Sequence, residues 1–559
     1  MKILIKGITS FLKISILFVE LIFSILFLFL IYLIWISQVK EPSFNEIKIN
    51  ARQINAEGHF QIGNSWLKKN PYGVWEMYLE GSPYQRGKIY GELSKELIQT
   101  QEKHFVNQID RIVHGSVWQH FLRLLIGFFN RDLISYIPIE YQQEMLGISH
   151  SFDKKYNYIS TPFSRILNYH AAHDIGHALA DYRVVACSSF GLKKDKSSDG
   201  QLLIGRNFDF YVGDEFAEDK LMLFIKPTKG YAFASYSWAG FIGVASGINE
   251  KGLTITINAA KSDLPTKAKM PISLLAREIL QYCSNVEEAI KIAKKREVFV
   301  SESLLIGSKN DNEIIIIEKT PNSTEVYRSN DNQTICTNHY QSKKLSKRKE
   351  NKINYENNDT RYRYERLKQL LSEKEKFSVV DAIHVLRDQK DYKEDTLGMG
   401  NPRAINQMIA HHSIVFQPER KICWISTKPY QLGKFISYNL DSIFKNKKND
   451  RYEELPADLF LQSDNYKKFV EFQEIKKEIQ AYLILGKEFA LSKEKEKRFI
   501  QSNSELYLTY QLLGDYYKKK GQKSKATFYY EKTLRKNIAS KGEEKKIIEE
   551  IKLLKKEKN

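Results

Sequence analysis

The sequence lacks several common signatures of enzyme chemistry. Its 559 residues contain only four cysteines, and none of them forms a Cys-x-x-Cys pair. This excludes a dense disulfide framework and the usual zinc or redox motifs. The sequence also has no G-x-x-x-x-G-K-[ST] loop, dinucleotide fingerprint or G-x-S-x-G elbow, so nothing in it indicates a bound nucleotide or a serine triad. We therefore expect no cofactor.

Acidic residues are in the minority. The chain has 86 Lys and Arg against 67 Asp and Glu, which gives a formal charge of +19. The lysines are spread along the chain and are densest after Lys434, where they alternate with glutamates. This pattern is typical of solvated helix faces, so we expect no nucleic-acid partner.

One long apolar run lies near the N-terminus, at residues 14–37, and Glu20 is its only charge. Its length suits a membrane-spanning helix. Lysines precede it and no small-x-small cleavage site follows, so residues 1–40 are predicted to be a retained anchor with the N-terminus in the cytoplasm. The chain after Gln38 would then lie on the periplasmic or extracytoplasmic side. The alternative is a cleaved secretory signal, because Glu20 shortens the purely apolar stretch.

The rest of the chain divides into three parts. Residues 41–186 are predicted to be mainly helical, with a strand near Trp75, and residues 187–444 mix strands with helices. Runs of strands separated by runs of helices favour an α+β fold with stacked layers of helix and antiparallel sheet. The strands are expected at 201–210, 220–227, 231–238, 252–260, 303–308, 313–320, 324–329 and 334–340, with a hairpin at 411–427, and the helices at 271–295, 363–371 and 379–386.

The tail, residues 445–559, is rich in lysine and glutamate with helical periodicity. Six of its residues have the spacing of one tetratricopeptide repeat. They are Tyr510, Leu513, Gly514, Tyr517, Ala526 and Tyr530. Such a repeat would offer a surface to a protein partner, and the alternative is a single helical hairpin packed on the catalytic domain.

The segment "VVACSSFGLKKDKSSDGQLLIGRNFDF" places Cys187 at the head of a predicted strand, hairpin and second strand. If Cys187 became the first residue of a chain, its own α-amine, with a pKa of about 8, would be a base beside the thiol. Ala186 is small enough for the thiol to attack the carbonyl behind it. Arg206 could hold the thiolate, and Asp209 could orient the new ammonium. The alternative is a buried cysteine beside a surface ion pair.

These residues resemble a known family. "ACSSF…GRNFDF", "GINEKGLTITIN" at 247–258 and "TNHY" at 337–340 look like N-terminal-nucleophile hydrolases of the isopenicillin-N acyltransferase type, as does "GSPYQRGKIYGELSKELI". Choloylglycine hydrolases and acid-ceramidase-like amidases are more distant relatives. The resemblance covers residues 78–427 and implies a four-layer αββα sandwich.

The resemblance also implies roles for single residues. Cys187 would be the nucleophile exposed by autocatalytic cleavage, with Arg206 and Asp209 as the arginine and aspartate of the returning strand. Asn258 and Asn338 would donate to the oxyanion, which lowers such a barrier by roughly 3 to 4 kcal/mol.

Two features depart from the family pattern or have no certain counterpart in it. The residue before the nucleophile is Ala186, where the acyltransferases often have glycine. A C-terminal substrate-binding arginine has no clear counterpart. Arg363 and Arg366 are candidates, but the helical pattern around them predicts that each is an exposed helix arginine.

A group of histidines precedes the nucleophile. His170, His173, Asp174 and His177 fall on one helical face, near the spacing of zinc proteases, but aspartate replaces the glutamate and Gly176 weakens the helix. We therefore predict no metal site and assign these residues to packing, with His170 and His173 as candidates for lining an acyl pocket.

The sequence thus predicts a membrane-anchored enzyme that cuts itself at Ala186-Cys187 and then acts as an amidohydrolase or acyltransferase on a linear amide or thioester. The anchor favours an amphipathic or lipid-derived acyl group. Two other functions stay open. One is an uncleaved, catalytically degenerate scaffold that presents the tail to a partner, and the other is a phospholipase-B-like ester hydrolase.

Overall fold

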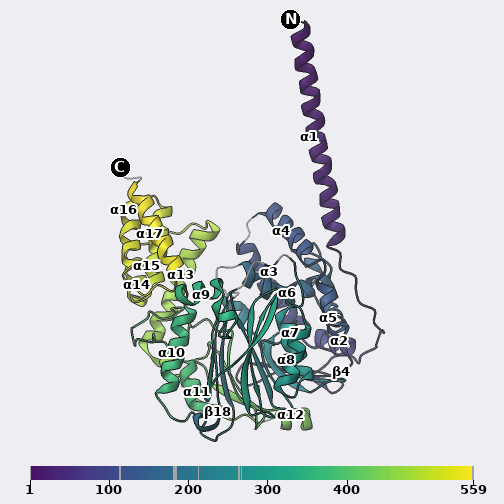
Figure 1. Ribbon diagram of the computed structural model, residues 1–559, viewed down its shortest axis with the longest axis vertical. Coiled ribbons are helices and arrows are strands. Elements are labelled where there is room, and N and C mark those ends of the chain that lie inside the picture. Colours follow the sequence, from purple (N-terminus) through teal and green to yellow (C-terminus); the bar gives the residue numbers. More distant parts are fainter. Residues whose placement is uncertain are drawn as a thin grey trace.

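Two β-sheets form the centre of the molecule, with helices on their outer faces (Figure 1). The computed structural model describes residues 2–112, 115–179, 185–211, 213–261, 265, 267–449 and 451–556. Helix α1 projects from this body (Figure 1). Its segment Ile14–Ile36 is long and apolar enough to cross a membrane, as an anchor or as a signal sequence.

The larger sheet holds eleven strands of the described chain, in the order β1-β2-β3-β4-β7-β8-β9-β10-β11-β12-β13. Neighbouring strands are antiparallel except β4 and β7, which run parallel. The strands are β1 Gln53–Ala56, β2 His59–Ile62, β3 Ser65–Lys69, β4 Trp75–Gly81, β7 Lys220–Pro227, β8 Phe233–Trp238, β9 Ser246–Asn249, β10 Leu253–Ala259, β11 Glu302–Ser308, β12 Glu313–Thr320 and β13 Ser323–Arg328.

The smaller sheet is antiparallel, in the order β14-β5-β6-β15-β16-β17-β18. Its strands are β5 Val185–Leu192, β6 Leu203–Phe210, β14 Gln333–Cys336, β15 His412–Gln417, β16 Ile422–Ser426, β17 Phe435–Asn439 and β18 Glu454–Leu455. Every residue of β6 is buried, including Arg206, Asn207 and Asp209. Polar groups in such a strand need partners inside the protein, or they serve chemistry.

Helices cover the outer side of each sheet. The helices of the main body are α2 Pro83–Leu93, α3 Lys95–Ile112, α4 Ser116–Phe129, α5 Ile139–Ser149, α6 Pro162–Leu179, α7 Ile272–Tyr282, α8 Val286–Lys295, α9 Lys349–Asn357, α10 Thr360–Ser372, α11 Val379–Leu386 and α12 Leu440–Asn446, and α1 is Lys2–Ile36. Helices α2, α5, α7 and α8 share one apolar core with the larger sheet. Helices α10 and α11 share another with the smaller sheet.

A third core is common to both sheets. Ile204 of β6 and Ile414 of β15 pack there with Leu305 of β11. Because side chains alternate along a strand, Phe190 of β5 and Leu203 of β6 point the other way, into the core shared with α10 and α11. Strands β5 and β6 are therefore buried on both faces.

Helices α2 and α5 touch backbone to backbone. A Cβ atom added at Gly87 would lie 2.0 Å from the carbonyl oxygen of Glu144, and one added at Gly147 would lie 2.5 Å from the amide nitrogen of Lys88. Next to this contact Arg86 bonds Glu144, which also accepts from Arg277 at 3.3 Å. The close approach of α2 and α5 thus brings the buried carboxylate of Glu144 into contact with both Arg86 and Arg277.

The tail consists of α13 Asp464–Leu485, α14 Lys493–Ser502, α15 Tyr507–Lys519, α16 Lys523–Thr533 and α17 Lys541–Lys556. All six residues of the predicted repeat motif are buried. Gly514 of α15 faces the ring of Tyr530 on α16, where an added Cβ would lie 2.5 Å from the ring. The tail contains the predicted helical hairpin.

Most predicted elements agree with the structure, and several are additional. Residues 41–186 were predicted to be mainly helical with a strand near Trp75, but residues 53–69 also form β1, β2 and β3, which extend the larger sheet. Helix α9 and strands β9 and β17 were also not predicted. All four cysteines lie within the described residues, and each is buried and free of a disulfide.

We expect Gly87→Ala to lower the free energy of unfolding by roughly 3 kcal/mol, because the new methyl group would overlap the α5 backbone. Denaturant unfolding of the detergent-solubilised chain measures this. Gly542→Ala is the control, since its added Cβ has nothing closer than 3.9 Å and should stabilise α17 by less than about 1 kcal/mol. Equal effects at the two positions would contradict the close helix contact.

Candidate active site

Cys187 lies on β5 and is fully buried. Its Sγ accepts a hydrogen bond from Nη2 of Arg206 at 3.4 Å, and its backbone amide donates to Oδ1 of Asn338 at 3.0 Å. Its carbonyl oxygen accepts from Nη1 of Arg363 at 2.6 Å. Thiol, amide and carbonyl therefore each have a polar partner from a different element.

Arg206 is oriented by the larger sheet. The β5–β6 register pairs Ser189 with Arg206, so Arg206 and Cys187 share the face of β5–β6 that looks toward that sheet. There Nη1 donates to the carbonyl of Ala245 at 2.7 Å and to Oγ of Ser246, and Nη2 donates to the carbonyl of Ile257. These bonds hold the Arg206 guanidinium beside the thiol of Cys187.

A histidine pair extends this arrangement. Ser246, which accepts from Arg206, lies 2.8 Å from Nε2 of His412. Nδ1 of His412 is in turn 2.9 Å from Nδ1 of His411. Burial lowers the pKa of both imidazoles well below the usual value, so the pair is neutral and acts through hydrogen bonding.

Arg363 of α10 lies on the opposite side of β5. Besides the Cys187 carbonyl, its guanidinium donates to Oδ1 of Asn338 at 2.8 Å and to Oδ1 of Asp359 at 3.0 Å. Asn338 follows β14, and its Nδ2 donates to the carbonyl of Ala259 at 2.9 Å. One arginine therefore ties the backbone of Cys187 to the asparagine that accepts from its amide.

Asp209 of β6 is directly opposite Ala186 in the strand register. It is fully buried, and within the described chain neither carboxylate oxygen has a hydrogen-bond partner. Burial raises the pKa of Asp209 to about 7, although Arg363 and Arg206 oppose this. A buried carboxylate without a partner, beside the proposed cleavage point, is suited to a cation that forms there later.

Asn258 of β10 completes the group from the larger sheet. Its Oδ1 accepts from Oγ of Ser189 at 2.9 Å, and its Nδ2 donates to the carbonyl of Cys336 at 3.0 Å. Its backbone neighbour Ile257 bonds Arg206. The side-chain amide of Asn258 is therefore held beside Ser189, which lies two residues along β5 from Cys187.

Burial raises the pKa of the Cys187 thiol, and the Arg206 guanidinium opposes this shift. Burial also lowers the pKa of Arg206. The intact chain thus favours the neutral thiol, and a nearby base has to take its proton before the sulfur can attack.

The structure brings together the sequence-predicted residues Cys187, Arg206, Asp209, Asn258 and Asn338. It corrects the prediction for two arginines. Arg363 and Arg366 were expected to be exposed on a helix, but both are buried, since α10 packs on the smaller sheet. Arg366 bonds Asp388 and Glu394, whereas Arg363 bonds the backbone carbonyl of Cys187.

Sequence reasoning missed Ser246, which accepts from Arg206, and His412, which contacts Ser246. His411 and His412 are adjacent in the sequence, and this spacing fits neither a metal site nor one helix face. A signal was available, since His412 begins a buried strand, where a polar side chain needs a partner.

The upstream histidines have packing roles where they are described. Burial lowers the pKa of His170 to about 4. Its Nδ1 contacts the carbonyl of Ile166 at 2.8 Å, and its Nε2 accepts from the amide of Ile242 at 2.9 Å, so neither ring nitrogen is left for a ligand. Asp174 accepts from the amide of Ile272 at the start of α7. The side chains of His173 and His177 lie outside the described residues.

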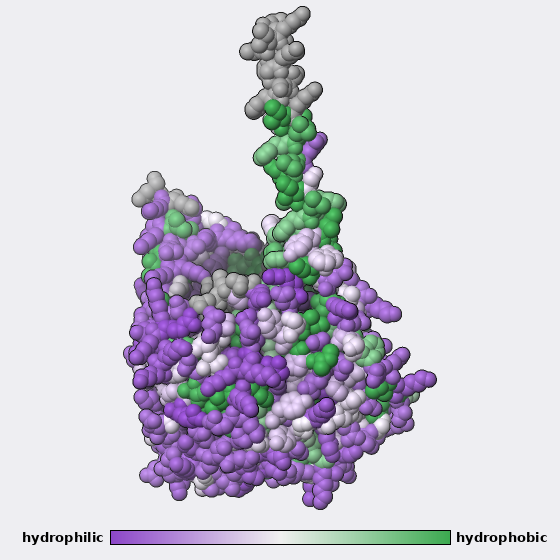
Figure 2. All heavy atoms as spheres, turned by 45° about the vertical axis from the view of Figure 1, so that its right-hand side comes forward, coloured by the Kyte–Doolittle hydropathy of each residue, from purple (hydrophilic) through white to green (hydrophobic). Residues whose placement is uncertain are grey.

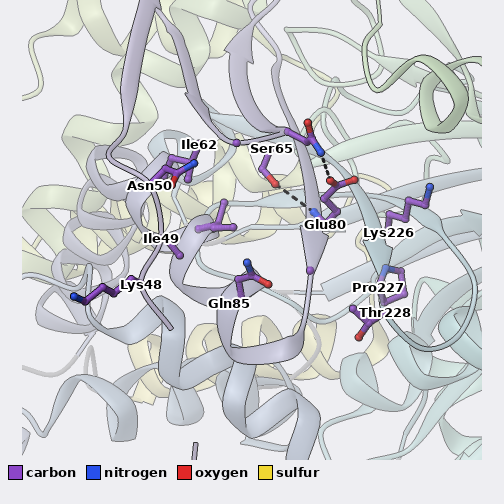
Figure 3. Close-up of a pocket in the computed structure, with 14 residues that line it drawn as sticks. Lys48, Ile49, Asn50, Ile62, Ser65, Glu80, Gln85, Lys226, Pro227 and Thr228 are labelled. Carbon is purple, nitrogen blue, oxygen red and sulfur yellow. Dashed lines mark hydrogen bonds between the residues drawn. The ribbon is translucent and has the colours of Figure 1, made fainter. Parts of the chain in front are cut away.

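Two surface pockets lie apart from these contacts. The larger, of about 520 Å³, is bordered by β3, β4, α2 and the 226–228 loop, and there Asn64 and Ser65 bond Glu80 (Figure 3). The second, of about 340 Å³, includes His339, next to Asn338, and Tyr364, next to Arg363. Cys187 lines neither of them.

Comparison with known proteins supports the class that the sequence resembles. Residues 195–427, which are less than half of the chain, match a family model of the N-terminal-nucleophile hydrolase superfamily. The model is that of the acyl-coenzyme A:6-aminopenicillanic acid acyl-transferase family. The matched segment contains Arg206, Asp209, Asn258, Asn338 and Arg363, whereas Cys187 precedes it.

Relatives match parts of the chain. An uncharacterized protein of Archaeoglobus fulgidus is 28% identical over 251 residues, which are 42% of this chain and 41% of that protein. Protein dcd1A of Dictyostelium discoideum is 25% identical over 318 residues, or 52% of this chain and 67% of that protein. This chain therefore spans less than half the length of the Archaeoglobus protein.

Two solved structures are also similar. An N-acylethanolamine-hydrolyzing acid amidase ortholog of Caenorhabditis elegans is 16% identical and covers 42% of this chain and 93% of its own, with a TM-score of 0.30. A mutant conjugated bile acid hydrolase of Clostridium perfringens is 14% identical and covers 49% and 97%, with a TM-score of 0.31.

We expect Asp209→Asn to stabilise the uncleaved chain more at pH 8 than at pH 5. The folded carboxyl has its pKa raised from 3.8 to about 7, so between these values it keeps a proton that the unfolded chain has lost. Stability therefore falls as pH rises from about 4 to about 7. Asparagine does not titrate, so Asp209→Asn removes this loss of stability at high pH.

Thermal unfolding of Cys187→Ala chains, with and without Asp209→Asn, measures the difference in Tm at both pH values. The parent chain carries Cys187→Ala so that it cannot cleave itself. A difference in Tm that is equal at pH 5 and pH 8 would contradict a buried carboxyl with a raised pKa.

Proposed function

We propose that this chain is a cysteine N-terminal-nucleophile amidohydrolase or acyltransferase that matures by cutting its Ala186-Cys187 bond. The observation that carries the proposal is the set of contacts around one buried residue, with Arg206 on the sulfur of Cys187, Asn338 on its amide and Arg363 on its carbonyl. The family match supports the general chemistry.

The maturation step begins when the sulfur of Cys187 attacks the Ala186 carbonyl carbon. The thiol proton passes to the departing nitrogen, the carbon–nitrogen bond breaks, and a thioester to Ala186 forms with a free amine on Cys187. Water then hydrolyses the thioester, which leaves a carboxylate on Ala186 and restores the thiol. The new ammonium forms beside Asp209, which lies opposite Ala186 in the sheet and has a buried carboxylate to balance it.

In turnover the freed α-amine acts as the base for its own thiol, because a terminal amine has a pKa of about 8. The thiolate attacks the carbonyl carbon of an acyl substrate, and the leaving amine or thiol takes the proton. Amide groups of Asn258 and Asn338 stabilise the oxyanion. Water or an acceptor amine then releases the acyl group from sulfur.

The finer features belong to the same proposal. The cores on both sides of β5 and β6 support a four-layer αββα arrangement around the site. The substrate is a linear amide or thioester with an amphipathic or lipid-derived acyl group. Helix α1 anchors the enzyme, with the catalytic domain outside the cytoplasm, and the tetratricopeptide-like hairpin α15–α16 binds a protein partner.

The purified protein should separate on a denaturing gel into fragments 1–186 and 187–559, and sequencing of the second should begin Cys-Ser-Ser-Phe. Cys187→Ala should remain one band, because it removes the attacking sulfur. Cys423→Ala, which changes another buried cysteine, should still be cleaved. An intact wild-type chain would instead favour the uncleaved scaffold.

The rate of cleavage should depend on Arg363. We expect Arg363→Lys to slow it about 10- to 100-fold, because lysine cannot bond the Cys187 carbonyl and Asn338 with one planar fork, and a hydrogen bond from a charged group contributes about 1.5 to 3 kcal/mol. Pulse-chase labelling in cells gives the rate. Arg366→Lys, one turn further along α10, is the control and should change it less than about twofold.

A further inference from the structure

On helix α4, two polar side chains bond the body while large apolar side chains are exposed, which is the reverse of an ordinary surface helix. Its Gln119 donates to Asp110 of α3 at 3.1 Å, and its Arg123 bonds the carbonyl of Tyr158, so both of these polar side chains bond the body. Trp118 and Phe121 are 65% and 48% exposed. A helix packed on a protein core would show the opposite arrangement.

The apolar side of α4 is continuous. Trp118, Phe121 and Leu125 follow the i, i+3, i+7 spacing of one helical stripe, and the first two form an edge-to-face pair with ring centroids 6.1 Å apart. Leu125 is 43% exposed, and none of the α4 side chains that the structure describes is fully buried. An exposed apolar stripe of this kind marks an interaction surface.

The position of α4 indicates what covers this stripe. A Cβ atom added at Gly127 of α4 would lie 2.5 Å from Oγ of Ser37, the residue just after the apolar segment of α1. Leu33 of α1 is buried at the same junction. Figure 1 shows α4 on top of the body, beside the lower end of α1, and Figure 2 shows apolar surface continuing from α1 onto the body there.

We propose that α4 lies in the surface of the lipid bilayer, with Trp118, Phe121 and Leu125 inserted beneath the headgroups. If α1 crosses a membrane, its end at Ser37 lies at the boundary between hydrocarbon and water, and its contact with Gly127 holds α4 at that depth. Tryptophan and phenylalanine on one side of a helix are typical of interfacial helices, which insert about 5–10 Å.

The C-terminal end of α4, which also contacts α1 at Gly127, is anchored to the body as well. Phe129 packs on Phe299 with ring centroids 5.8 Å apart, and Asn130, just after the helix, donates to Asn168 at 2.8 Å. The C-terminal end of α4 is therefore fixed to the body. With α1 it gives the body a second attachment to the bilayer, which fixes its orientation over the membrane.

Quenching of tryptophan fluorescence by brominated lipids tests the proposal. The full chain is reconstituted in phosphatidylcholine nanodiscs whose acyl chains carry bromine at a shallow or a deep position. The parent carries Trp35→Phe, which removes the tryptophan of α1, and it is compared with the same chain carrying Trp118→Phe. Since Trp118 is exposed, phenylalanine there should not disturb folding.

Shallow bromines should quench the parent, and Trp118→Phe should remove most of that quenching, whereas deep bromines should have less effect. Trp424→Phe, in a buried strand, is the control and should leave the fluorescence intensity that shallow bromines quench unchanged. Equal quenching with and without Trp118, or no quenching of either chain, would overturn the proposal. Since the measurement involves no turnover, its failure would leave the proposed catalytic function unaffected.

Discussion

The double hydrogen bond of Arg363, to the carbonyl of Cys187 and to Oδ1 of Asn338, is the interaction on which the candidate site depends. It fixes the peptide unit after Cys187, and Asn338 fixes the amide before it. The guanidinium of Arg206 holds the sulfur from the other side of the strand. With backbone and thiol both held, attack of the sulfur on the Ala186 carbonyl would close a five-membered ring.

This arrangement requires a strand that is buried on both faces. On one face of β5, Cys187 belongs to the core that includes the larger sheet, and on the other face Phe190 belongs to the core of α10 and α11. Side chains on the two faces of the β5–β6 pair therefore contact different elements. Arg206 points toward the larger sheet, and Arg363 approaches β5 from α10 on the other face. The same burial raises the pKa of Asp209 and of the Cys187 thiol. In the intact chain both groups are therefore shifted toward their neutral forms, and cleavage would give the Asp209 carboxylate an ammonium group as its partner.

Much of this could be predicted from the sequence, because strong local patterns carry it. The Cys187 hairpin and the strand that carries Asn258 were predicted, because their apolar and β-branched residues are bounded by turn residues. Arg363 was expected to be exposed, because helical periodicity cannot tell which face of α10 packs on a sheet. His412 and Ser246 were missed because their bond joins segments far apart in the chain. The strands at 53–69 were missed because they are short and partly polar.

The central claim is that the sulfur of Cys187, at a new chain terminus, carries the acyl group during turnover. The most direct test is mass spectrometry of the membrane-extracted protein, quenched in acid during turnover of a linear acyl amide, followed by peptide mapping. The account predicts an acyl adduct on the fragment that begins with Cys187, attached to that residue and released by hydroxylamine. An acyl group on any other residue, or turnover by a chain whose Ala186-Cys187 bond is intact, would contradict it.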